Sequence, residues 1–358
     1  MASATRDERF GEWPLKRLMT EVVGSGTKSA ADMTRAQATE AFERILADDP
    51  DPTTLGAFWL ANRWKHNVPE ELAAFVDVMD DRVERVAPDC DPVDCGANYD
   101  GKGETAILGV AAGLVSAAAG VPVVVHSGDR VPTQKQDAYK HVLDELGVDT
   151  SRSPAESAAM IDETGFGFYY QPAFNPAIHG LHGRRDQMGV RTFVNTVETL
   201  ANPADADVHL GSFYHLAFAK KLCETVERAD SASFDRVIMF QGMEGYDDIR
   251  PGYTKVAEWH ADGAFDDFEI ETAEYGMTFD RDGLAVDETD VAGDSAQITE
   301  SVVTGERTDG FADAVALNAA VRIYAGGGAD TLDEGLETAR DVLASGDAAD
   351  VLAGLRAH

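Results

Sequence analysis

The first eighty residues carry apolar side chains at the spacing of amphipathic helices. The first such stripe consists of Leu15, Leu18, Met19, Val22 and Val23. Thr34 followed by Gln37 matches a capping box and predicts the start of a second helix. Two further helices are predicted, one over about residues 54–64 and one opening at Val68. We therefore predict a small all-helical domain over residues 12–80.

After Pro88 the pattern changes to short apolar runs that alternate with helical stretches. Such alternation is typical of α/β domains, in which helices flank a central sheet. Buried strands are predicted at residues 121–125 and 236–240, and residues 268–279 and 296–304 could add strands. Helices are predicted at residues 106–119, 139–146, 311–324 and 332–343. We therefore predict a large α/β domain over residues 81–358, and a helix from this later part of the chain could complete the small domain.

The charge of the chain changes what kind of partner can be expected. Among 358 residues, 64 are acidic and 30 are basic, which gives a formal net charge of -34. Such a charge repels itself in dilute salt, whereas molar salt shortens the Debye length to roughly 3 Å and screens the repulsion. Because the acid excess is spread along the chain, we interpret it as halophilic surface chemistry. An acidic mesophilic protein with a basic partner is the alternative.

Unaided nucleic-acid binding is not expected, since it depends on Lys and Arg neutralising phosphates.

The cysteine spacing and the lack of apolar targeting segments lead us to expect a protein of the reducing cytoplasm. The three cysteines, Cys90, Cys95 and Cys223, form neither a CxxC pair nor a zinc-binding spacing. The amino-terminal residues 1–13 lack the apolar core of a signal peptide. The longest apolar run, residues 107–125, is interrupted by glycines, Ser116 and Pro122, so no membrane span is expected.

Two polar loops follow segments predicted to be extended. In the first, from Gly96 to Thr105, glycines would let backbone amides converge on an anion at a helix start, and Lys102 could add a cation. The spacing is not that of a Walker loop, and a flexible turn is the alternative. The second loop, His126 to Lys135, follows an apolar strand directly, where ligands bind in parallel sheets. A strand-to-helix loop with satisfied caps, and Arg130 as a surface ion-pair partner, is the alternative there.

Two further segments carry groups of charged side chains that could bind an ion. Glu244, Asp247 and Asp248 follow an apolar strand and could hold Mg²⁺, although adjacent carboxylates also arise by chance in so acidic a chain. The segment from Asn175 through Arg184 and Arg185 could bind an anion, or its arginines could pair with surface carboxylates. His179 and His182 are spaced for a metal, but no third ligand is evident.

Taken together and in this order, these segments resemble the anthranilate phosphoribosyltransferase family, glycosyltransferase family 3, over about residues 12–356. The family's GTGGD loop is matched by residues 96–100, its KHGNR loop loosely by residues 125–130, and its R-x-x-LG-x-RT-x-FN segment by residues 185–195. The family's NP pair is matched by Asn202 and Pro203, and its G-x-DG-x-DE metal motif by residues 242–248.

The sequence also departs from the family pattern. Asn98 and Tyr99 replace two glycines of GTGGD, and Val125 replaces the lysine of KHGNR. Residues 107–110 replace the hydroxyl-bearing NxST helix start. Lys102, Arg130, Thr133 and Lys135 could replace the lost phosphate contacts. These features are more similar to divergent anthranilate phosphoribosyltransferase-like members, some of which bind nucleic acid.

The resemblance implies a fold with a small helical domain and a large α/β domain of the nucleoside phosphorylase/phosphoribosyltransferase type. It implies Mg²⁺-dependent transfer of a phosphoribosyl group from phosphoribosyl pyrophosphate to an aromatic amine such as anthranilate, in a cytoplasmic homodimer. The donor-binding residues implied are Gly96, Asn98, Tyr99, Asp100, Gly101, Lys102, Thr105, His126, Asp129, Arg130, Thr133 and Lys135. Asn175 and Arg185 would contact the acceptor, Glu244, Asp247 and Asp248 the metal, and no general base is evident. A non-catalytic ligand- or nucleic-acid-binding member, or a nucleoside phosphorylase, remains the alternative.

Overall fold

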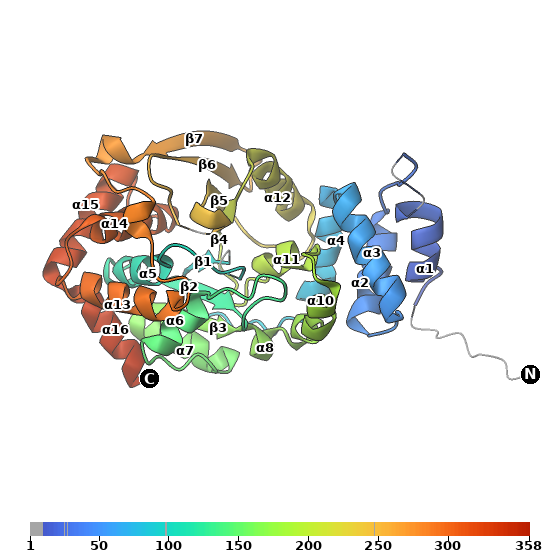
Figure 1. Ribbon diagram of the computed structural model, residues 1–358, viewed down its shortest axis with the longest axis horizontal. Coiled ribbons are helices and arrows are strands. Elements are labelled where there is room, and N and C mark those ends of the chain that lie inside the picture. The colour runs from blue at the N-terminus through green and yellow to red at the C-terminus, as the bar shows by residue number, and fades with distance from the viewer. Residues whose placement is uncertain (1–9, 25, 27, 97–98, 247) are drawn as a thin grey trace, which may run out of the picture.

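The amino-terminal part of the chain is helical in the computed structural model, which describes residues 10–24, 26, 28–96, 99–246 and 248–358. Its elements are α1 (Leu15–Leu18), the π-helical turn η1 (Met19–Val23), α2 (Arg35–Leu46), α3 (Pro52–Lys65) and α4 (Pro69–Asp80). They lie together at one end of the molecule (Figure 1). The predicted capping box is confirmed, because the Thr34 hydroxyl accepts from the Gln37 amide while the Gln37 side chain accepts from the Thr34 amide at 2.9 Å.

A seven-stranded sheet forms the centre of the larger part. Its strands are β1 (Val93–Cys95), β2 (Val123–Ser127), β3 (Phe166–Tyr170), β4 (Val208–Phe213), β5 (Arg236–Gln241), β6 (Tyr253–His260) and β7 (Phe265–Glu271). The order is β3-β2-β1-β4-β5-β6-β7. The first five are parallel and the last two pairings are antiparallel. The carboxyl ends of the parallel strands therefore lie along one edge of the sheet.

Helices and short turns connect and cover these strands. The longer ones are α5 (Gly109–Ala118), α6 (Tyr139–Glu145), α7 (Pro154–Thr164), α10 (His182–Met188), α12 (Leu216–Arg228), α13 (Val291–Val303), α14 (Gly310–Ala325), α15 (Leu332–Ser345) and α16 (Asp347–Ala357). The shorter ones are α8 (Gln171–Phe174), α9 (Pro176–His179), α11 (Val194–Val197), η2 (Glu198–Leu200), η3 (Met243–Gly245), η4 (Thr272–Tyr275) and η5 (Asp282–Leu284).

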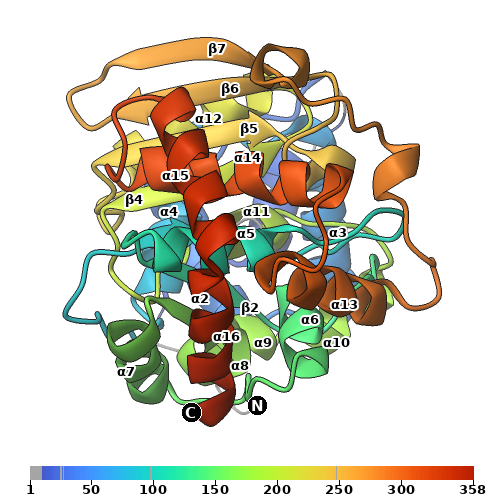
Figure 2. The same ribbon diagram turned by 90° about the vertical axis from the view of Figure 1, so that its left-hand side faces the viewer.

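Both faces of the parallel part of the sheet are buried, as expected of parallel strands, whereas the edge strand β7 is mostly exposed. Val123 and Val125 of β2 face a core shared with α5, α14 and α16, whereas Val124 between them faces the opposite core. Figure 2 views the molecule from the side on which α14, α15 and α16 cover the sheet. On the other side, α12 packs against α4 and so joins the sheet to the helical end of the molecule. The predicted fold class, a small helical part beside a larger α/β part, is confirmed.

Most predicted elements are present, with shifted ends. The predicted strands at 121–125 and 236–240 are β2 and β5, whereas the strand predicted at 268–279 ends at Glu271. The strand predicted at 296–304 is wrong, since these residues belong to helix α13. Its β-branched residues favoured a strand, but Ser295, Ile298, Thr299 and Val302 recur at helical spacing and are buried together. In the described part of the chain, no helix is long and apolar enough to cross a membrane.

Candidate active site at the carboxyl edge of the sheet

The polar loops singled out in the sequence meet at the carboxyl edge of the sheet. Strand β1 lies between β2 and β4, because the chain adds β2 and β3 on one side of β1 and then crosses to add β4 and β5 on the other side. Ligands of open α/β sheets bind outside the strand ends at such a switch point. The loop after β1 also contacts the loop after β2, through an isolated bridge between Lys102 and Asp137.

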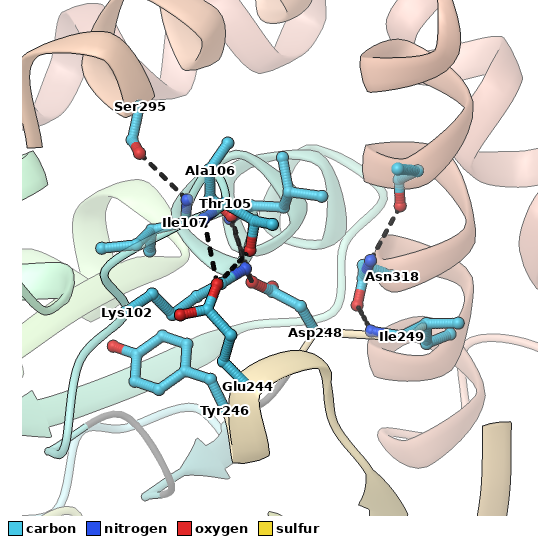
Figure 3. Close-up of polar contacts among 12 residues, drawn as sticks. Lys102, Thr105, Ala106, Ile107, Glu244, Tyr246, Asp248, Ile249, Ser295 and Asn318 are labelled. Carbon is cyan, nitrogen blue, oxygen red and sulfur yellow. Dashed lines mark hydrogen bonds and ion pairs between the residues drawn. The ribbon is translucent and has the colours of Figure 1, made fainter. Parts of the chain in front are cut away.

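Glu244, in the loop after β5, reaches across to the loop after β1 (Figure 3). Its carboxylate accepts hydrogen bonds from the Thr105 amide at 2.9 Å, the Thr105 hydroxyl at 2.6 Å and the Gly103 amide at 3.0 Å. Burial alone would raise the pKa of Glu244, but these hydrogen bonds and the charge of Lys102 outweigh it and lower the pKa. The loop amides therefore bind an anion, and in this state the anion is a carboxylate of the same chain.

Lys102 and Asp248 form a completely buried ion pair beside Glu244 (Figure 3). The Lys102 ammonium lies 2.7 Å from Oδ2 of Asp248 and donates to the Ala106 carbonyl at 2.6 Å. The other carboxylate oxygen, Oδ1, is buried and has no hydrogen-bond partner among the described residues. Lys102 thus joins the loops after β1 and β5 from within, and its charge is already neutralised.

A second buried network connects β1, β2 and β4. The Tyr99 hydroxyl lies 2.8 Å from Nδ1 of His126. Asp94 is shared by two histidines, with Oδ1 3.0 Å from Nε2 of His126 and Oδ2 2.6 Å from Nδ1 of His209. Burial alone would raise the pKa of Asp94, but His126 and His209 outweigh it and lower the pKa to about 2.

The two residues implied for acceptor binding are also engaged within the protein. The Arg185 guanidinium binds both oxygens of Glu198, at 2.8 and 2.6 Å, and both side chains are buried. Gln171 donates to the same carboxylate at 3.0 Å. Asn175 is buried, and its side-chain oxygen caps α9 by accepting from the Ile178 amide at 3.3 Å.

The remaining predicted residues lie around these networks. Arg130 pairs with Asp137 and Lys135 with Asp186, whereas Asp129 accepts from the Tyr170 hydroxyl. Thr133 and Lys135 have left-handed backbones, with φ of 78° and 55°. Asp100 pairs with Arg191 at 2.8 Å.

Gly96 and Gly101 are buried where a Cβ would collide with the carbonyls of Thr199 and Asp137. Asn98 and Asp247 fall outside the described residues.

Two cavities adjoin each other at this edge. The first, of about 310 Å³, has aromatic walls and is called here the aromatic cavity; Tyr99, Phe213, Tyr214, Phe218 and His209 line it. The second, of about 710 Å³, is called the arginine cavity; Arg191, Arg250, Arg281, Glu244 and Tyr214 line it. Arg191 and Tyr214 form walls of both, so the two cavities are neighbours.

Carboxylates are present for a divalent ion, although they do not form a ready cluster. The described residues contain no group of three or more His, Cys, Asp and Glu placed to hold a metal. Carboxylate oxygens are nevertheless the ligands that Mg²⁺ prefers. The unpartnered Oδ1 of buried Asp248 and the carboxylate of Glu244 on the arginine cavity provide such oxygens. The donor chemistry therefore fits Mg²⁺.

Sequence reasoning assigned no role to Asp94, His209 or Glu198, although Asp94 directly precedes the first polar loop. Asp94 and His209 were hidden inside short strands, and β4 was not predicted at all. The signal that could have revealed them is an ionisable side chain within an otherwise apolar strand, because burial of such a group demands a partner.

Comparison with known proteins agrees with this architecture. Residues 22–83 match the glycosyl transferase family helical bundle domain, and residues 95–349 match the glycosyl transferase family a/b domain. The anthranilate phosphoribosyltransferase of Natronomonas pharaonis is 33% identical over 331 residues, covering 91% of this chain and 95% of the relative. The crystal structure of the Thermus thermophilus anthranilate phosphoribosyltransferase is 27% identical, with a TM-score of 0.78 and coverage of 96% and 99%. The Saccharomyces cerevisiae enzyme in complex with PRPP and Mg shares the fold, at 17% identity, a TM-score of 0.78 and coverage of 96% and 97%. On the strength of the two family domains and these relatives, the chain belongs to glycosyl transferase family 3.

Proposed function

We propose that the chain is a pentosyltransferase that transfers a phosphoribosyl group from phosphoribosyl pyrophosphate to an aromatic amine such as anthranilate. The observation that carries the proposal is the pair of adjoining cavities, one lined by arginines and one by aromatic rings. A polyphosphate donor and a flat aromatic acceptor would meet at the shared wall of Arg191 and Tyr214. Homologues with this activity match nearly the whole chain.

The donor's pyrophosphate is assigned to the arginine cavity. Three guanidinium groups are notable there because the chain as a whole carries a net charge of -34. Arg281 pairs with Glu104 and Arg191 with Asp100. Arg250 contacts the Tyr253 carbonyl at 3.2 Å and the Tyr253 ring, and none of its described contacts is to a carboxylate. Arg250 is therefore the guanidinium most available to a phosphate.

The cofactor is Mg²⁺, which a related yeast structure contains together with PRPP. Glu244 and Asp248, with Asp247 beside them in the sequence, would hold the ion. When bound, Mg²⁺ supplies positive charge that stabilises the departing pyrophosphate. The other assigned donor contacts come from residues of the loops over 96–105 and 126–135, as implied by the family resemblance.

The acceptor is assigned to the aromatic cavity. Tyr214 and Phe218 would stack on its ring, and the guanidinium of Arg63 would attract an acidic substituent. The family resemblance assigns Asn175 and Arg185 to the acceptor as well. Because Glu198 holds both ends of the Arg185 guanidinium, a direct contact with an acceptor carboxylate would require that ion pair to open.

The reaction would break the bond between C1 of the ribose and the pyrophosphate oxygen, while the acceptor nitrogen bonds to C1. By analogy with glycoside hydrolysis, the transition state has oxocarbenium character. The residues of the two cavities would contribute mainly by holding the two substrates in line and excluding water.

The test is pyrophosphate release in molar salt with phosphoribosyl pyrophosphate, Mg²⁺ and anthranilate. Arg250→Gln is expected to raise the KM for the donor by about 10- to 100-fold, as for loss of one charge-assisted hydrogen bond. Arg307→Gln, on a surface ion pair with Asp309, is the matched control. Absence of release with wild-type protein, or phosphorolysis of nucleosides instead, would refute the proposal.

Three further properties remain proposals. We divide the chain into a helical domain over residues 12–80 and an α/β domain over 81–358, near the limits of the matched family domains. A homodimer through the helical domain is supported by Trp64 of α3, which is 72% exposed. A cytoplasmic location agrees with the low, odd number of cysteines.

A further inference from the structure

In the network around Asp94, one ring nitrogen of His209 has no partner among the described residues. Asp94, as a carboxylate, can only accept, so Nδ1 of His209, 2.6 Å from Oδ2, carries the proton that faces it. Nδ1 of His126 lies 2.8 Å from the Tyr99 hydroxyl. Nε2 of His209 is left with a lone pair, and it has no partner among the described residues.

That nitrogen belongs to a side chain at the wall of the aromatic cavity. His209 lines the cavity together with Tyr99 and Gly211. A Cβ at position 211 would lie only 3.1 Å from Nε2, so glycine at this position avoids a tight contact with the ring. His209 is completely buried, and Asp94 fixes its ring from the opposite side. An acidic residue that orients the far nitrogen of a histidine is the arrangement of a general base.

The other candidate bases near the cavities are already engaged or are not oriented. Asp100 pairs with Arg191, and Glu244 accepts four hydrogen bonds from the loop after β1. His215 also lines the aromatic cavity, but it is exposed and makes no described side-chain contact with a carboxylate. His209 can accept a proton without breaking any existing bond, because its imidazolium would still donate to Asp94.

We propose that His209 is the general base of the transfer reaction and that Asp94 is its positioning residue. The inference rests on the proposed function. As the acceptor's amine nitrogen bonds to C1 of the ribose, the bond from C1 to pyrophosphate breaks and pyrophosphate leaves with its electron pair. The nitrogen loses one proton, which Nε2 of His209 takes up and later releases to solvent.

The experiment compares His209→Ala, His209→Gln and Asp94→Asn with wild type in molar salt. Both His209 variants should lower kcat by about 10²- to 10⁴-fold, the usual contribution of a general base, with little change in the KM for the donor. Added imidazole should restore part of the kcat of His209→Ala but not of His209→Gln, in which the glutamine fills the space. His260→Gln, at the opposite edge of the sheet, is the control and should behave as wild type.

A spectroscopic measurement tests Asp94 separately. Nitrogen-15 NMR of histidine-labelled protein should show His209 protonated at Nδ1 and not at Nε2, and Asp94→Asn should alter that signal while calorimetric binding of phosphoribosyl pyrophosphate persists. Unchanged kcat in the His209 variants, or a proton on Nε2 in wild type, would overturn the inference. An inactive wild type with the predicted NMR signal would instead count against the proposed transferase function, so the two failures are distinguishable.

Discussion

Lys102 was expected to contact a phosphate, but its ammonium lies in a completely buried pair with Asp248. A buried pair is costly to break from one side, because the remaining charge is left without a partner or water. Its position between the loops after β1 and β5 suggests that it fixes their separation.

Lys102→Met is therefore expected to lower the free energy of unfolding by about 3–5 kcal/mol, the usual cost of stranding a buried charge. The double variant Lys102→Met with Asp248→Asn should lose less, since no charge remains buried. Guanidinium-induced unfolding measures both. Equal losses in the single and double variants would show that the pair is not the source of the effect.

Asp80, at the end of α4, provides a test of pH dependence. Burial raises its pKa to about 6, against the opposing effects of Arg85 and Ser231. Because the folded state holds this proton more tightly than the unfolded state, Asp80 makes stability fall as pH rises from about 4 to 6. The loss is on the order of 3 kcal/mol at most, from roughly 1.4 kcal/mol per pKa unit. Asp80→Asn should flatten this part of the profile in thermal unfolding; an unaltered slope would contradict the assignment.

At the scale of elements, the loop after β5 and the loop before α5 hold each other through Glu244. The Glu244 backbone is left-handed, with φ of 56°, which is uncommon for a residue other than glycine. The carboxylate occupies the amides at which the sequence predicted an anion. A substrate phosphate at those amides would have to displace it.

Glu244→Gly should free the Gly103 and Thr105 amides without backbone strain, since glycine accepts positive φ. In the absence of Mg²⁺, this variant is expected to bind pyrophosphate about tenfold more tightly than wild type, measured by calorimetry. Glu244→Gln, which keeps an oxygen for the amides, should change less. Weaker binding in the glycine variant would mean that phosphate does not use these amides.

Elements also show where sequence patterns mislead. The helix expected from residue 106 begins at Gly109, because Thr105, Ala106 and Ile107 instead contact Glu244, Leu284 and Ser295. These partners lie more than a hundred residues away in the chain, so no local pattern indicates them.

At the scale of the whole molecule, the net charge determines how the stability of the fold depends on salt. With a net charge of -34, self-repulsion destabilises the folded chain in dilute buffer. The midpoint of thermal unfolding should therefore rise by at least several degrees between about 0.1 M and molar KCl, as the Debye length falls from roughly 10 to 3 Å. Circular dichroism measures the midpoint. A midpoint that is constant or falls with salt would contradict the halophilic interpretation.

The sequence by itself determined the amino-terminal helices, the strands β2 and β5, the acidic surface and the loops that carry the site. These follow from periodicity, capping residues and composition, which are local or additive properties. Only the tertiary structure decided which charges face one another. It paired Lys102 with Asp248 and Arg185 with Glu198, and it joined Asp94 to His209 across neighbouring strands. Burial makes each of these groups depend on one specific partner, and distance along the chain conceals that partner until the sheet has formed.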